Sequence, residues 1–108
     1  MQLLTNELRQ ELPPLYSQDG NPGSLAIVKF FDPVGAATWW ATEFDGEDTF
    51  FGFATLGDPG DAELGYFSLK ELESIPASQE RFWTGIERDI SFQPRKLSDI
   101  ITEVRVRR

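Results

Sequence analysis

Residues 25–56, LAIVKFFDPVGAATWWATEFDGEDTFFGFATL, carry the strongest indication of the fold of this chain. They hold two of the three tryptophans and most of the nine phenylalanines. Aromatic and β-branched residues favour strands, whereas the DPVG and DGED segments inside this stretch favour turns. The sequence therefore predicts successive strands with tight connections. The three predicted strands cover residues 25–31, 37–44 and 49–56.

The flanking segments predict short helices and two further strands. Thr5 is placed to cap a helix over residues 5–12, and Ser68 and Glu71 have the spacing of a capping box that begins a helix over residues 68–75. Strands are expected at residues 63–67 and, as a charged edge, at residues 85–92. Phe82 and Trp83 lie in a predicted loop and are expected to pack as anchors. Residues 96–104 are expected to form a short helix or an extended arm.

These elements predict an α+β fold. The length of 108 residues suits one domain covering residues 1–108, with a basic C-terminal end at residues 95–108. We expect a mostly antiparallel sheet of about five strands with two or three short helices, packed chiefly on one face.

The charge of −8 is unevenly distributed. Residues 1–94 carry five basic and sixteen acidic side chains, whereas residues 95–108 carry five basic and two acidic ones. An acidic body repels phosphate and attracts basic proteins, so we expect no direct nucleic-acid binding and favour a protein partner. The cations at the end are expected to stabilise the end of a C-terminal helix through its dipole.

The composition excludes several kinds of chemistry. The chain has no histidine, which removes the usual general base and any Ser-His-Asp relay. It has no cysteine, which removes disulfides and thiolate metal sites. No signal-peptide pattern or membrane-length apolar run is present, so a cytoplasmic protein without membrane contact is expected. We predict no cofactor, and a non-enzymatic role is favoured.

Large aromatic side chains alternate onto both faces of the predicted sheet. In the second strand, Trp40 and Phe44 are expected on one face and Trp39 and Glu43 on the other. Either helices cover both faces or one face is a binding surface. The residues that we select for aromatic contact with a partner are Trp39, Trp40 and Tyr66.

An acidic group lies in the second hairpin. Its members, selected for acidic recognition, are Glu43, Asp45, Glu47 and Asp48. Together with the acids at residues 58–63, such a group could hold Ca²⁺ or Mg²⁺, and Glu43 beside Glu63 or Asp32 could form a hydrolytic carboxylate pair. Acidic turns are more often simply solvated, and the spacing fits no EF-hand.

Several blocks of the chain together resemble one family. KFFDP, TWWATEF, FFGFATL, GYFSLKELESI and IERDISFQPRKLSDI, with the N-terminal LLTNELRQELPPLYSQDGNP, are similar to the family catalogued as domain of unknown function 2958. The resemblance implies a bacterial plasmid, phage or other mobile element as the source, sometimes beside antirestriction-type genes. It implies a role in element maintenance or counter-defence and brings no catalytic residues.

The function predicted from these observations is that of an accessory protein of a mobile element that binds a protein partner. The partner would be a basic DNA-handling or defence protein, engaged by acidic mimicry of nucleic acid. One alternative is a carboxylate- or metal-dependent hydrolase. Another is a homo-oligomeric module that uses its aromatic sheet face. Salt dependence separates the binding modes, because mimicry weakens steeply with ionic strength and apolar contact does not.

Overall fold

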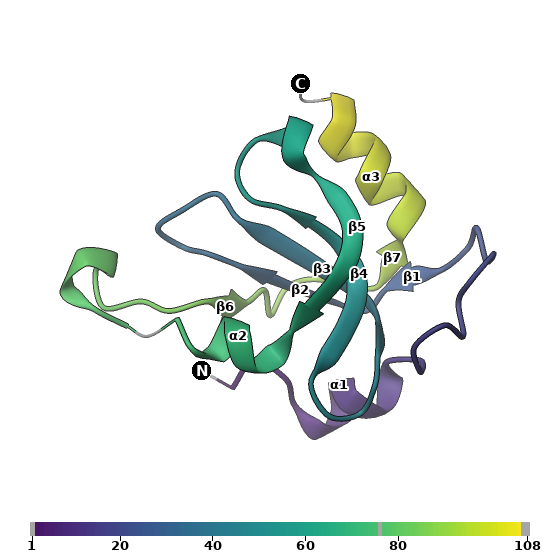
Figure 1. Ribbon diagram of the computed structural model, residues 1–108, viewed down its shortest axis with the longest axis horizontal. Helices are drawn as coiled ribbons and strands as arrows, with labels where there is room; N and C mark the ends of the chain where they lie inside the picture. The colour runs from purple at the N-terminus through teal and green to yellow at the C-terminus, as the bar shows by residue number, and fades with distance from the viewer. Residues whose placement is uncertain (1, 76, 107–108) are drawn as a thin grey trace.

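The structure is a computed structural model that describes residues 2–75 and 77–106. Its main sheet has five antiparallel strands in the order β5-β4-β3-β2-β6, and β1 and β7 form a separate antiparallel pair (Figure 1). The predicted α+β fold is thereby confirmed. The strands are β1 (Leu25–Ala26), β2 (Val28–Phe31), β3 (Thr38–Phe44), β4 (Thr49–Thr55), β5 (Glu63–Ser68), β6 (Glu87–Arg88) and β7 (Arg95–Lys96).

Short helices connect and flank these strands. The Thr5 hydroxyl accepts the Leu8 N–H at 3.2 Å, and Ser68 accepts the Glu71 N–H at 3.2 Å, so both predicted N-caps are confirmed. The C-terminal segment is helical. The helices are α1 (Asn6–Glu11), α2 (Leu69–Glu73) and α3 (Leu97–Val106), with 3-10 turns η1 (Pro59–Asp61) and η2 (Gln79–Arg81). None of the helices in the described ranges is long and apolar enough to cross a membrane.

Two predicted strands are shorter in the structure. The strand expected at residues 25–31 divides at Ile27, because β1 leaves the main sheet to pair with β7. The strand expected at residues 85–92 contributes only β6. Asp89 ends it by forming a turn, in which its carboxylate accepts the Ser91 N–H at 2.9 Å.

A β-bulge in β3 changes which side chains share a face. The register with β4 shifts between Ala41 and Glu43, so the strict alternation expected beyond residue 41 is wrong. Phe44 consequently packs in the same core cluster as Ala41. Glu43 lies opposite Phe51 in the ladder.

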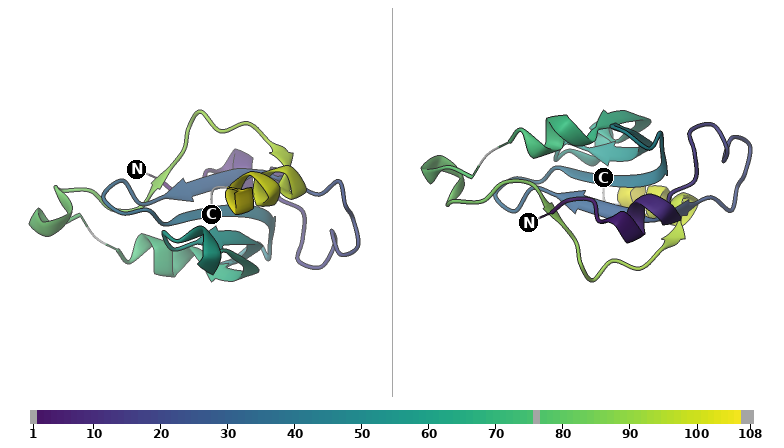
Figure 2. Two further views of the ribbon diagram at one scale, coloured as in Figure 1. Left: turned by 90° about the horizontal axis from the view of Figure 1, so that it is seen from above. Right: turned by 90° about the horizontal axis from the view of Figure 1, so that it is seen from below.

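Two cores cover the two faces of the twisted sheet (Figure 2). Residues of α1 and α2 pack in the first core and residues of α3 in the second, so the expectation that the helices lie chiefly on one face holds only for the two shorter helices. The strand residues of the first core are Val28, Phe30, Ala41, Phe44 and Phe50. Those of the second are Ala26, Trp40 and Phe53, which pack with Leu97, Ile100 and Val104 of α3.

Candidate protein-binding surface

The carboxylate of Asp45 is used inside the hairpin between β3 and β4. Asp45 Oδ1 accepts the backbone N–H groups of Glu47, Asp48 and Thr49 at 2.8, 2.8 and 3.0 Å. These hydrogen bonds, with that from Glu47 the strongest, lower the pKa of Asp45. Asp45, one of the acids predicted to recognise a partner, therefore stabilises its own turn.

Asp48 joins the same hairpin to α2. Its carboxylate accepts the Ser68 hydroxyl at 2.6 Å and the Lys70 N–H at 2.7 Å. The hydrogen bond from Ser68 is the main cause that lowers the pKa of Asp48. The Ser68 hydroxyl in turn accepts the Glu71 N–H, so one chain of hydrogen bonds links the hairpin to the first turn of the helix.

Glu43 is buried, with 2% of its surface exposed. Its two carboxylate oxygens accept the backbone N–H groups of Tyr16 at 3.0 Å and Gln18 at 2.7 Å. The loop before β1 is thereby attached to β3. Of the four predicted recognition acids, Glu47 is the exposed one whose carboxylate forms no hydrogen bond or ion pair within the described residues.

The three predicted aromatic contact residues have different environments. Trp40 is buried beside Phe53, and Trp39 is half-buried against the first core. Tyr66 on β5 is 57% exposed, with its ring edge-on to Phe51 and Tyr16. The structure therefore does not bring the three residues together, and Tyr66 is the one that lies at the surface.

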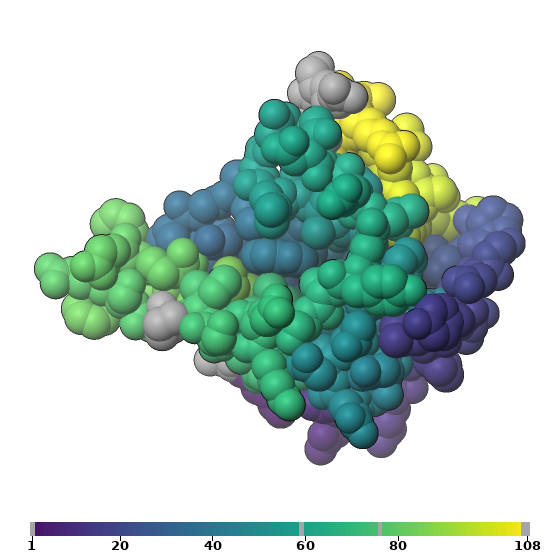
Figure 3. All heavy atoms as spheres, in the orientation of Figure 1, coloured from purple at the N-terminus to yellow at the C-terminus, as the bar shows by residue number. Residues whose placement is uncertain are grey.

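The most exposed aromatic side chains lie elsewhere, in a loop that we term the aromatic arm (residues 77–85). Phe82 and Trp83 are 78% and 72% exposed, so the expectation that they pack as anchors is wrong. The arm extends away from the sheet, to the left in Figures 1 and 3. Two neighbouring aromatic side chains are therefore presented to solvent at a protruding point.

The backbone at these two residues is strained. Phe82 has φ 53° and Trp83 has φ 63°, in the left-handed region that bulky L-residues rarely adopt. Each such residue costs about 1–3 kcal/mol and persists only where its surroundings impose the conformation. The Trp83 N–H donates to the Ser78 carbonyl at 2.7 Å and closes the turn.

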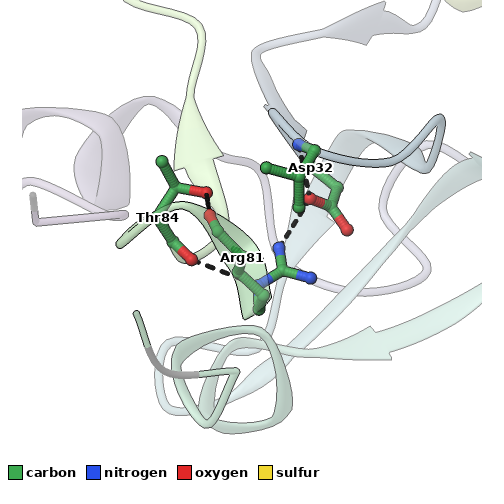
Figure 4. A network of polar contacts seen from close by, with 4 residues as sticks. Asp32, Arg81 and Thr84 are labelled. Atoms are coloured by element: carbon green, nitrogen blue, oxygen red, sulfur yellow. Dashed lines mark hydrogen bonds and ion pairs between the residues drawn. The ribbon is translucent and has the colours of Figure 1, made fainter. Parts of the chain in front are cut away.

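Arg81 fixes the base of the aromatic arm (Figure 4). Its Nη2 donates to Asp32 Oδ1 at 2.6 Å and its Nε to the Thr84 carbonyl at 3.1 Å, while the Thr84 hydroxyl donates to the Arg81 carbonyl at 2.7 Å. Burial acts to raise the pKa of Asp32, but the hydrogen bonds from Arg81 and from the Val34 N–H outweigh it and lower the pKa overall. The arm is thus held to the end of β2 by a charged contact.

A hollow of about 460 Å³ lies beside the aromatic arm. Trp83 lines it together with Leu72 of α2 and Ile86. Its lining also includes Glu73 and Glu87. The surface next to Trp83 therefore combines apolar and acidic groups.

Comparison with known families gives one match. The model described as a protein of unknown function, DUF2958, covers residues 3–106. The chain belongs to the DUF2958 family. No curated protein and no solved structure matches this DUF2958 protein.

Asp32 and Glu43, the two carboxylates of this DUF2958 protein that could form a hydrolytic pair, have other partners. Asp32 is paired with Arg81, and Glu43 accepts the loop N–H groups. Within residues 2–75 and 77–106, no three acidic side chains are grouped so that they could hold a metal ion. The geometry therefore gives no support to the hydrolase alternative.

A cavity of about 630 Å³ lies between β2, β3 and α3, and Trp40 contributes to its lining. Its charged groups are already paired with one another. Lys29 lies 3.6 Å from Asp89, and Arg95 forms two hydrogen bonds to Glu103 at 2.6 and 2.9 Å. These groups are therefore satisfied within the protein, and the cavity is a weaker candidate site than the aromatic arm.

The exposure of the aromatic arm differs from the sequence expectation for a physical reason. Adjacent aromatic residues more often belong to a core, which is why packing is the expected role of Phe82 and Trp83. The available signal was that polar residues surround them in SQERFWTG, without the alternation that would bury one side. The turn that carries them is attached through the contact between Arg81 and Asp32, which are 49 residues apart.

Proposed function

We propose that this DUF2958 protein is a non-enzymatic binding protein that captures a partner protein with Phe82 and Trp83 of the aromatic arm. The observation that carries the proposal is the 78% and 72% exposure of these two side chains on a strained and anchored turn. Large aromatic residues are the commonest anchors of protein interfaces, and a preformed turn reduces the entropy lost on binding. Strain of this kind is often concentrated at functional sites.

The charge around the arm indicates the chemistry of the partner. Glu80 in the arm is exposed, and Glu73 and Glu87 line the adjoining hollow. The cation of the arm, Arg81, is neutralised by Asp32. A partner with an apolar pocket bordered by basic residues would therefore be complementary, which agrees with the net charge of −8.

Recognition through the acidic hairpin remains a prediction with less support. Glu43, Asp45 and Asp48 hold the fold together, which leaves Glu47 as the carboxylate free to meet a partner. The predicted role in a mobile element, and the identity of the partner as a DNA-handling or defence protein, likewise remain proposals. A DNA-handling protein would be a basic partner of the kind that the charge around the arm favours.

The experiment compares capture by three forms of the protein in extracts of the organism that encodes it. These are the wild type, the double variant Phe82→Ala/Trp83→Ala and, as a matched control, Ile90→Ala, since Ile90 is 75% exposed and lies outside the arm. We expect one partner to be retained by the wild type and the control and to bind the double variant more than tenfold more weakly.

The salt dependence of capture and the hairpin variant Glu47→Lys distinguish this proposal from acidic mimicry. Capture that persists at high salt and does not change in Glu47→Lys supports the apolar contact of the arm. Capture that is unaffected in the double variant, or that disappears in Glu47→Lys, would overturn the proposal and favour acidic mimicry. Circular dichroism of each variant verifies that the fold is intact.

A further inference from the structure

Strand β5 forms one edge of the main sheet, and the hydrogen-bond pattern shows which of its groups point outward. The Leu69 N–H donates to the Asp48 carbonyl at 2.8 Å, just beyond the register pair Thr49 and Ser68. Hydrogen-bonded pairs alternate along an antiparallel ladder, so Glu63, Gly65 and Phe67 of β5 bond inward to β4. The N–H and C=O groups of Leu64 and Tyr66 therefore face away from the sheet.

This edge lacks the devices that usually prevent strand pairing. Proteins protect exposed edges with charges, prolines, bulges or very short strands. After Glu63, the one charged residue of β5, residues 64–68 have none of these, and the outward residues Leu64 and Tyr66 are 50% and 57% exposed. At the opposite edge, β6 is two residues long and consists of Glu87 and Arg88.

We propose that β5 pairs antiparallel with β5 of a second copy of the chain, with Gly65 opposite Gly65. In this register the outward groups of Leu64 in each copy bond to those of Tyr66 in the other. The Leu64 and Tyr66 side chains then form two cross-strand pairs of an aliphatic and an aromatic residue. The space beside Gly65 is open, since a Cβ built there has no neighbour within 4 Å.

Charge favours a second copy in this register over an unrelated strand. Glu63 lies opposite Phe67 of the other chain, so no like charges face each other within the strands. Just beyond the strands, the end that carries Asp61 lies beside the end where the exposed Lys70 follows the first residue of α2 in the other copy. The pairing sequence is thus self-complementary, while the net charge of −8 on each chain opposes association at long range.

The experiment measures the mass of the purified protein by sedimentation over a series of concentrations. We expect the mass to rise toward twice 12.2 kDa, with an association constant that increases several-fold from low to high salt. Leu64→Pro should remain a monomer with an unchanged circular dichroism spectrum, because the Leu64 N–H takes no part in the ladder with β4. Leu64→Lys should have the same effect without proline, whereas the matched control Ile90→Lys should dimerise like the wild type.

A cysteine test examines the register. The chain has no cysteine, so Gly65→Cys introduces a single thiol. Opposed residues of a non-hydrogen-bonded antiparallel pair lie about 4.5 Å apart at Cα, which permits a disulfide. We expect oxidised glutathione to cross-link Gly65→Cys into dimers and to leave the control Glu63→Cys largely uncross-linked.

A mass of 12.2 kDa at all concentrations, dimers that persist in Leu64→Lys, or cross-linking that is equal in the two cysteine variants would overturn the proposal. If the β5 edge instead receives a strand from another protein, the purified chain would have a mass of 12.2 kDa at all concentrations. The inference is independent of the aromatic arm, since Phe82→Ala/Trp83→Ala should dimerise like the wild type. Failure of the partner capture described above would therefore leave this result unchanged.

Discussion

Arg81 donates a 2.6 Å hydrogen bond to Asp32 and joins two segments that are 49 residues apart in the sequence. The two side chains are 22% and 16% exposed, so solvent screens the contact only in part. The contact connects the end of β2 to the base of the aromatic arm. The position of Phe82 and Trp83 therefore depends on a charged pair that neither segment contains by itself.

Removal of this charge should destabilise the protein in a pH-dependent manner. Since the pKa of Asp32 is lowered in the folded state, its stabilising effect is present above the unfolded pKa, near 3.8, and is lost as the pH falls through the folded value. We expect Asp32→Asn to reduce the free energy of unfolding by about 1 kcal/mol at pH 7. Urea unfolding at pH 7 and at a pH below the folded pKa measures the difference, which should shrink at the lower pH. A cost that is equal at both would contradict the assignment.

The strained turn should become more stable with glycine. Trp83 is 72% exposed and has φ 63°, so Trp83→Gly loses little packing and removes the steric cost of the left-handed conformation. We expect the free energy of unfolding to rise by about 1 kcal/mol while partner capture is lost. A clear loss of stability in urea unfolding would show that the indole is a packing element after all.

Two acids of similar sequence position should differ in their effect on stability. Glu43→Gln keeps the size of the side chain but replaces one of the two accepting oxygens, so a partly buried N–H of Tyr16 or Gln18 loses its partner. This should cost about 1–3 kcal/mol. Glu47→Gln is the matched control and should change the free energy of unfolding by less than about 0.5 kcal/mol. Equal effects in thermal unfolding would argue against the structural role of Glu43.

A pair of glycines provides a test of the sheet register. Gly52 lies opposite Gly65, and a Cβ at Gly52 would approach the Trp40 carbonyl oxygen to 1.8 Å. Gly52→Ala should therefore cost about 3 kcal/mol or more, because the backbone of β3 has to move. Gly65→Ala meets no atom within 4 Å and should cost less than about 1 kcal/mol. Chemical unfolding of both variants measures the contrast, and similar losses would place the strands in a different register.

Local patterns predicted the features that depend on neighbouring residues. The caps at Thr5 and Ser68 and the strands β3 and β4 follow from side-chain hydrogen bonding and strand preference, and the structure confirms them. The division of the first strand at Ile27 and the bulge before Glu43 could not be predicted in this way. Both involve contacts with segments that are distant in the sequence. The strand β1 pairs with β7, and the carboxylate of Glu43 accepts the Tyr16 N–H from the loop before β1.

The α+β class and the net charge of −8 follow from composition, periodicity and local motifs in the sequence. Membership of the DUF2958 family rests on the match of the family model to residues 3–106. Which acids and aromatic residues are available to a partner is evident from the folded chain alone. Glu43 and Trp40 became buried, whereas Phe82 and Trp83 became exposed. The physical reason is that the exposure of a side chain depends on contacts between residues far apart in the chain, which a pattern of neighbouring residues does not encode.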